Sequence, residues 1–230
     1  MHAQLSAITK QFLKEANAEK APAMKAYLLH QFEFYGLQTP IRRQLCKAHY
    51  KEYAVKNLDE LESIVKEAWN LSQREYQYFA VELYSFHKKL WNKSSIQLME
   101  YCLIHKSWWD SVDHIASEWL SDYFKQFPEQ IIPITGKWNQ SSNIWLQRSS
   151  IMFQKAYKKN TNTELLSKYI LHCKNSKEFF IQKAIGWALR EYYKTDALWV
   201  KKFVQQHQHE LSPLSKREAL KTFFRETKTE

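Results

Sequence analysis

Five side chains that could do chemistry occupy matching positions in three helical stretches of the sequence. Trp109 and Asp113 are four residues apart, so they share one face of a helix. Arg148 follows Asp113 by 35 residues, Lys183 follows Arg148 by 35, and Trp187 lies one turn beyond Lys183. A carboxylate among indoles can stabilise developing positive charge, and the two cations can contact phosphates. A helical core would more often hold Leu and Ile here, so this set, the stripe, predicts a lined groove.

Each residue of the stripe also has a purely structural interpretation. Asp113 could serve only to pair with Arg148 and hold the helices in register, and both tryptophans could be ordinary core aromatics. Lys183 fits either a phosphate contact or a solvated surface. The nine histidines show no metal-ligand spacing, so no metal site is predicted. No Ser/His/Asp or Cys/His arrangement follows from spacing either, and the residue types alone leave the alternatives open.

The elements that would position the stripe are amphipathic helices separated by short polar breaks. The predicted helices are 3–16, 20–33, 40–53, 57–69, 73–89, 93–105, 108–125, 128–139, 143–158, 162–173, 177–193, 196–208 and 213–226. No Gly/Ser linker or low-complexity tract divides them, so a single domain of residues 1–230 is predicted.

Every second predicted helix resembles the others at an offset of 35 residues. Gln147 aligns with Gln182, 35 residues later, and Gln77 lies two periods of 35 residues before Gln147. Serines near the helix starts follow nearly the same spacing and are predicted N-caps: Ser72, Ser107, Ser142, Ser176 and Ser212. Ser72 with Glu75, and Ser107 with Asp110, fit a capping box. Such a repeat predicts an all-α fold, an α-solenoid of HEAT-like helix pairs that forms a curved superhelix with a basic concave groove.

The composition excludes several other classes of protein. Gly and Pro together make only 8 of 230 residues, and the three glycines are isolated. This excludes a phosphate-binding P-loop and a dinucleotide-binding fingerprint, and it makes an all-β fold improbable. Nine Trp, 13 Tyr and 13 Phe supply a sizeable core.

The net charge of +10 is concentrated in the last third of the chain. Residues 1–147 carry 17 basic and 16 acidic residues, whereas residues 148–230 carry 17 basic and 8 acidic residues. A solvated basic surface would explain this, but together with the repeats the excess favours a face that binds phosphates.

Cysteine usage and hydropathy predict an intracellular protein. The three cysteines are far apart and odd in number, which fits neither a disulfide framework nor a zinc knuckle. No apolar run approaches the ~20 residues of a spanning helix, so no membrane association is expected.

Several segments resemble the AlkD-like family of bacterial alkylpurine DNA glycosylases over about residues 1–226. They are GLQTPIRRQL from Gly36, KSWWDSVDHIASEWL from Lys106, NIWLQR from Asn143, KEFFIQKAIGWALREY from Lys177 and PLSKREAL from Pro213. The combination of WWDSVD with NIWLQR at this distance is specific. One departure is that family members can carry a lysine where this chain has Ala156, next to Lys155.

The resemblance implies a monofunctional enzyme of base excision repair. It would hydrolyse N3- and N7-alkylated purines, including 3-methyladenine and 7-methylguanine, from duplex DNA without a base-flipping pocket, a metal or a cofactor, and would leave an abasic site. The implied catalytic aspartate is Asp113, with Trp109 and Trp187 flanking the lesion and Arg148 in the active site. The implied DNA contacts are Gln38, Thr39, Arg43 and Arg190, and the stripe adds Lys183. A monomer acting at the nucleoid of the bacterial cytoplasm is expected.

Two other functions fit the repeats. A non-catalytic solenoid that binds damaged or branched DNA would share the charge but would not need Asp113 between Trp109 and Arg148. A peptide-binding scaffold would bind its partner with little dependence on salt, whereas phosphate binding weakens steeply as salt rises.

Overall fold

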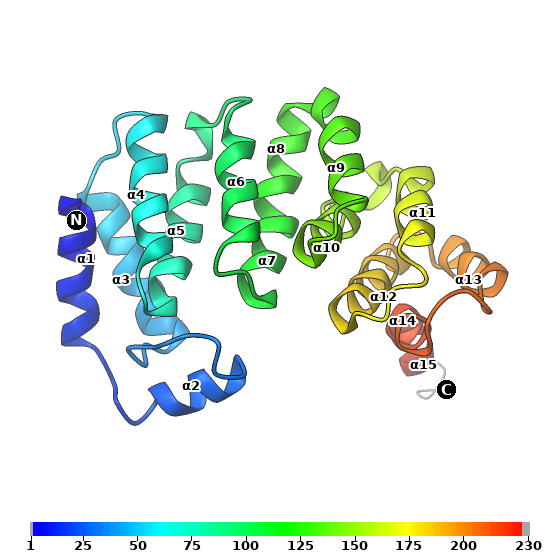
Figure 1. Cartoon of the computed structure of the whole chain (residues 1–230), viewed down its shortest axis with the longest axis horizontal. Coiled ribbons are helices and arrows are strands. Elements are labelled where there is room, and N and C mark those ends of the chain that lie inside the picture. Colours follow the sequence, from blue (N-terminus) through cyan, green and yellow to red (C-terminus); the bar gives the residue numbers. More distant parts are fainter. Residues whose placement is uncertain (1, 227–230) are drawn as a thin grey trace. The chain divides into compact units, whose positions relative to one another are not determined.

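The computed structural model describes residues 2–226, and nearly all of them belong to helices or short connections (Figure 1). The α-helices are α1 Ala3–Lys14, α2 Ala21–Tyr27, α3 Thr39–Glu52, α4 Leu58–Asn70, α5 Arg74–Phe86, α6 Ser95–Ile104, α7 Trp109–His114, α8 Leu120–Gln126, α9 Ile131–Asn139, α10 Ile144–Met152, α11 Thr163–His172, α12 Phe179–Tyr193, α13 Ala197–Gln206, α14 Pro213–Ala219 and α15 Lys221–Glu226. A π-helical segment, Ile115–Trp119, joins α7 to α8. Over residues 2–226 no strand forms, and the predicted all-α, solenoid-like fold is confirmed.

The 35-residue period is visible in the observed helix starts. Five helices, α3, α5, α7, α10 and α12, begin 35 residues apart, and α14 begins 34 residues after α12. The repeated glutamines explain part of this regularity. The side-chain amide of Gln77 donates to the carbonyl of Trp69 (2.9 Å), and that of Gln147 donates to Asn139 (3.2 Å). Each bond ties a helix of the period to the end of the helix before it.

The chain forms two compact units, residues 1–98 and residues 99–230. In the first unit α4 packs on α5, and α3 packs on both α1 and α5. In the second unit α7, α10, α12 and α14 follow one another as neighbours, and α9, α11 and α13 pack behind them. Residue 1 and residues 227–230, which the single-domain prediction also covers, lie outside the described residues. That single domain, the curvature and the basic groove stay predictions.

Most helix boundaries lie within a few residues of those predicted. The largest differences are at the end of α10, which stops at Met152 where the pattern predicts a helix to residue 158, and at the end of α2. Helix α2 ends at Tyr27, whereas the pattern predicts a helix to residue 33. Leu29 (φ 54°) and His30 (φ 59°) adopt the left-handed conformation, which ends the helix. Neither residue type signals such a stop, so the sequence pattern could not reveal it.

The predicted serine N-caps are wrong except for one. Ser212 caps α14 by accepting from the backbone N–H of Ser215 (3.0 Å). At the other four sites the helix begins later than predicted, with Gln73, Trp108, Asn143 and Glu178 at the N-cap. The two capping boxes fail for the same reason. The Glu75 carboxylate instead accepts from the N–H groups of Tyr35, Gly36 and Leu37.

His49 is a buried core residue of α3 in the first unit. Its ring stacks on Tyr53 with centroids 4.4 Å apart, and neither ring nitrogen has a hydrogen-bond partner among the described residues. Burial disfavours the charged ring and lowers the pKa of His49 to about 4 from its usual 6.5.

We expect the folded state to lose stability as the pH falls below 6.5. The unfolded chain takes up a proton at His49 there, whereas the native ring stays neutral until about pH 4. Between pH 7 and pH 5 this linkage removes roughly 2 kcal/mol. This loss is measured by urea unfolding of the wild type and of His49→Phe at pH 7 and at pH 5. An equal change of unfolding free energy in the two proteins contradicts the assignment.

Candidate functional site

Helix α7 places Trp109 and Asp113 on one face in the second unit. Trp109 is the first residue of this short helix, and Asp113 follows it by four residues. The π-helical segment follows directly, and its Ser117 hydroxyl donates to the backbone carbonyl of Asp113. The predicted pairing of these two residues on one face is therefore present. Trp109 is only partly buried, which sets it apart from the fully buried core tryptophans Trp69, Trp119 and Trp138.

Asp113 and Arg148 form a bidentate ion pair between α7 and α10. The Arg148 Nε donates to Asp113 Oδ1 at 2.7 Å, and a terminal nitrogen donates to Oδ2 at 2.9 Å. The remaining terminal nitrogen donates to the backbone carbonyl of Phe180. The Arg148 side chain is 1% exposed and that of Asp113 is 17% exposed. A buried planar guanidinium thus fixes a carboxylate that still reaches the surface.

Helix α12 brings Lys183, Trp187 and Arg190 to the same region. The spacings of four and three residues place these side chains on one face of the helix. The guanidinium of Arg148 lies 5.3 Å from the centre of the Trp187 ring, and the Lys183 amine lies 5.1 Å from it. Lys155 and Arg190 each lie 5.8 Å from the same ring. Four cations therefore surround one partly buried indole.

Glu218 is a second carboxylate of this cluster, and the sequence interpretation missed it. It lies in α14, and its oxygens accept from Lys183 (2.8 Å), Arg190 (2.7 Å) and the indole N–H of Trp187 (3.2 Å). Burial raises the pKa of Glu218, but the hydrogen bond and charge of Lys183 and the charges of Arg190 and Lys221 outweigh it and lower the pKa overall. The 35-residue period could have indicated Glu218, since it lies 35 residues after Lys183.

Three aromatic residues pack together at the starts of the helices that carry the site. Trp108, Trp145 and Phe180 belong to the starts of α7, α10 and α12. The Phe180 ring lies 5.3 Å from Trp108 and 4.9 Å from Trp145. Because the Phe180 carbonyl also accepts from Arg148, this aromatic packing helps to fix the guanidinium.

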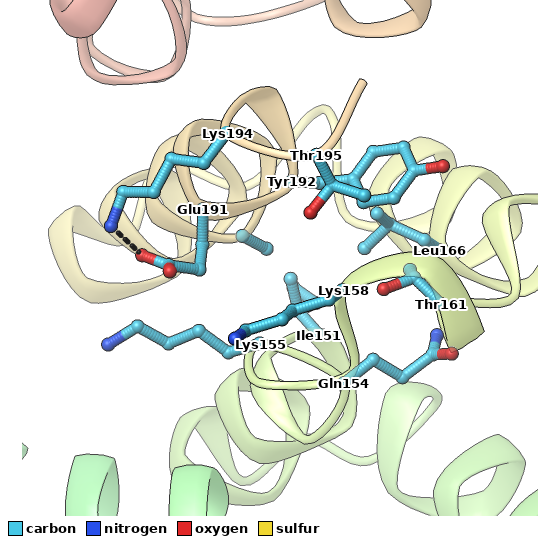
Figure 2. A pocket seen from close by; sticks show the side chains of 11 residues that line it. Ile151, Gln154, Lys155, Lys158, Thr161, Leu166, Glu191, Tyr192, Lys194 and Thr195 are labelled. Atoms are coloured by element: carbon cyan, nitrogen blue, oxygen red, sulfur yellow. Dashed lines mark hydrogen bonds and ion pairs between the residues drawn. The ribbon is translucent and has the colours of Figure 1, made fainter. Parts of the chain in front are cut away.

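A pocket of about 310 Å³ lies next to the cations around Trp187 (Figure 2). Figure 2 shows the ion pair of Glu191 and Lys194 (2.7 Å) on one wall, with Lys155 and Lys158 on the opposite wall. Lys155 belongs both to this pocket and to the surroundings of Trp187. A lysine therefore lies beside the site, although position 156 is alanine.

The remaining predicted contacts lie in the first unit, at the start of α3. Gln38 occupies the N-cap position and Thr39 is the first helical residue. Both are exposed, and the Arg43 side chain is 65% exposed, 3.4 Å from Glu82. These three residues are accessible, and their contact with DNA stays a prediction.

Among the described residues, few groups suit metal binding or thiol chemistry. Within residues 2–226 no cluster of three or more His, Cys, Asp or Glu side chains is arranged to hold a metal ion. All three cysteines are buried. Among the described helices, none has the length and apolar character needed to cross a bilayer.

Comparisons with known proteins agree on one family. The family model described as DNA alkylation repair enzyme matches residues 8–223. A solved structure, a predicted DNA alkylation repair enzyme from Enterococcus faecalis, is 33% identical with a TM-score of 0.83. The match covers 90% of this chain and 95% of that one. No curated protein matches. The chain belongs to the family of DNA alkylation repair enzymes.

Proposed function

We propose that the protein is a monofunctional DNA glycosylase for N3- and N7-alkylated purines in duplex DNA. The observation that carries this proposal is the Asp113 carboxylate, which is fixed by buried Arg148, whose guanidinium lies 5.3 Å from the ring of the partly exposed Trp187. The family concerns repair of alkylation damage, and hydrolysis of the N-glycosidic bond is the repair reaction that this site suits best.

The proposed reaction needs stabilisation of positive charge more than proton transfer. An N3- or N7-alkylated purine is already cationic, so it departs without a general acid. The bond between C1′ of the deoxyribose and N9 breaks, its electron pair stays on the purine, and positive charge builds on the sugar. Asp113 stabilises that charge and can orient the attacking water, which adds to C1′ and releases a proton to solvent. The products are a neutral alkylpurine and an abasic site.

The geometry of Asp113 supports this role. Electrostatic stabilisation works best when the charged group is held in place before the reaction, so that no reorganisation is needed in the transition state. Arg148 holds both carboxylate oxygens, and the backbone carbonyl of Phe180 holds Arg148. The carboxylate is fixed from its buried side and keeps its remaining surface toward a substrate.

The two tryptophans are proposed to flank the damaged nucleotide. Indole faces attract cations by roughly 0.5–2 kcal/mol per contact. A cationic purine or a developing oxocarbenium ion on the sugar would gain this attraction from Trp109 and Trp187. Damaged and normal purines differ in charge, so the same contacts favour the damaged base.

The charge of the cluster supports binding of DNA. Arg148, Lys155, Lys183 and Arg190 contribute +4, and Asp113 and Glu218 contribute −2, which leaves +2 around Trp187. A net positive site suits the phosphates that flank a lesion. We propose phosphate contacts for Lys183 and Arg190 here, and further DNA contacts for the exposed residues at the start of α3: Gln38, Thr39 and Arg43.

Two observations argue against other repair reactions. Transfer of the alkyl group to a cysteine needs a reactive thiolate, and burial raises the pKa of Cys46 to about 12 and that of Cys173 to about 11. Insertion of a flipped base usually needs stacking partners. The pocket that contains Lys155 is instead lined by charged, polar and aliphatic side chains, and Tyr192 is the single aromatic residue among them. These features favour hydrolysis without a base-flipping pocket.

The remaining properties are proposed together with this reaction. Water is the only co-substrate, so no metal or cofactor is called for. We propose that residues 1–230 act as one domain and as a monomer, in the bacterial cytoplasm where the chromosome lies.

The proposal is tested by incubating the protein with methylated duplex DNA and quantifying released 3-methyladenine and 7-methylguanine by chromatography. We expect release well above the spontaneous rate. Salt-sensitive binding of the same DNA without such release would identify a non-catalytic DNA-binding protein and reject the proposal.

A further inference from the structure

Glu218 connects three functional side chains of α12 from a neighbouring helix. Lys183 occupies one carboxylate oxygen, and Arg190 and the Trp187 indole occupy the other. The Glu218 side chain is 9% exposed, so water competes little for these bonds. Glu218 and Arg148 both contact Trp187: Glu218 accepts from its indole N–H, and the Arg148 guanidinium lies 5.3 Å from the centre of its ring.

The backbone is built to bring Glu218 this close. Helices α12 and α14 pack side by side (Figure 1), and Gly186 faces α14. A Cβ atom at Gly186 would lie 2.4 Å from Glu218 Cβ and 2.9 Å from the Ser215 carbonyl oxygen, which no packed side chain tolerates. The buried Ser215 hydroxyl also donates to the Gln182 carbonyl at 2.9 Å. Glu218 therefore sits on a tightly registered helix pair.

The bond to Trp187 fixes the orientation of its ring. An indole has a single donor, so the acceptor that it finds determines the ring's rotation. The same ring lies 5.3 Å from the Arg148 guanidinium, which holds Asp113. The Glu218 charge also holds the Lys183 and Arg190 cations, which would otherwise repel each other and a cationic purine.

We propose that Glu218 is a positioning residue, which sets the ring plane of Trp187 and the places of Lys183 and Arg190 for the reaction at Asp113. This role rests on the proposed glycosylase function. Glu218 acts through these side chains and not on the substrate. A shift of about 1 Å in such a supported group can lower a catalytic rate by about 100-fold.

The first measurement follows the indole N–H of Trp187 directly, without substrate. A ¹H–¹⁵N correlation spectrum resolves the nine tryptophan indoles, and Trp187→Phe assigns the peak. We expect Glu218→Ala to move this peak and to speed its exchange with solvent. Glu210→Gln is the matched control, because Glu210 pairs with Lys174 in the same unit at a similar sequence separation. That variant leaves the Trp187 peak in place.

The second measurement separates catalysis from binding. At saturating protein, we expect Glu218→Ala to lower the single-turnover excision rate by about 10- to 100-fold. The apparent Kd for duplex DNA changes much less, because the cations remain. Glu218→Gln keeps an acceptor oxygen and the side-chain volume, so it recovers part of the rate. A merely structural role would not give this split between rate and binding, nor the partial recovery by Gln.

Two outcomes overturn the proposal: an unmoved Trp187 peak in Glu218→Ala, or an excision rate equal to that of Glu210→Gln. Should Glu218→Ala not fold, Glu218→Gln takes its place, and its Trp187 peak and rate must differ from those of the control. If the wild type does not excise alkylpurines, the proposed function fails, and the Trp187 peak alone decides whether Glu218 positions the ring.

Discussion

Asp113→Asn is expected to lower the single-turnover rate of alkylpurine excision by about 100- to 1000-fold, the usual effect of removing one electrostatic group from a transition-state site. The substitution keeps the side-chain volume and one acceptor oxygen for Arg148, but it removes the charge that would face the developing cation on the sugar. DNA binding is expected to hold or to tighten, because a negative charge is lost from a site that faces phosphates.

A neighbouring carboxylate provides the control for this prediction. Asp110 lies in the first turn of the same helix, and we expect Asp110→Asn to excise at close to the wild-type rate. The measurement uses a duplex with a single N7-methylguanine and protein in excess. Excision by Asp113→Asn at the wild-type rate would mean that Asp113 only holds α7 and α10 in register.

Arg148→Ala is expected to have the largest effect on stability, about 3–5 kcal/mol, as is typical when one partner of a buried ion pair is removed. The variant removes the bidentate partner of Asp113, and it leaves the Phe180 carbonyl without its guanidinium donor. It also creates a cavity, because the Arg148 side chain is almost completely buried.

Arg148→Lys tests whether charge alone explains this stability. A lysine restores the charge but cannot bond both carboxylate oxygens and the Phe180 carbonyl in one plane, so an intermediate loss is expected. Lys194→Met serves as the surface control, since the Lys194 side chain is 58% exposed in its pair with Glu191, and we expect a change within about 0.5 kcal/mol. Urea unfolding measures all three. Equal stabilities of Arg148→Ala and Lys194→Met would contradict a supporting role for Arg148.

The sequence predicts the central pair of the site because a repeat converts sequence spacing into lateral contact. Asp113 and Arg148 are 35 residues apart on neighbouring helices of the period, and they meet in the structure. The same reasoning holds for Gln77 and Gln147, whose side-chain amides donate equivalent hydrogen bonds to backbone carbonyls in different repeats. A period this regular leaves few alternatives for which residues face each other across adjacent helices.

Local features were harder to predict, because they depend on single residues and not on the period. The serine N-caps fail because each of these helices begins one or two residues later than the serine predicts, and at Gln73, Trp108 and Glu178 no side chain caps the helix. The end of α2 depends on left-handed Leu29 and His30, which have no sequence signature. Glu218 is different, because it does lie on the period, 35 residues after Lys183. It was missed because a charged residue in a short helix resembles a solvated surface residue until the contact with Trp187 is seen.

The central claim is that the protein cleaves the bond between deoxyribose and a cationic alkylpurine, and the masses of both products test it most directly. A duplex with one N7-methylguanine is incubated with the wild type and with Asp113→Asn, and both the strand and the small-molecule fraction are analysed by mass spectrometry. The account predicts free 7-methylguanine and an intact strand with one abasic site, formed far faster with the wild type. A strand that loses only its methyl group, or that stays unchanged while bound, would contradict it.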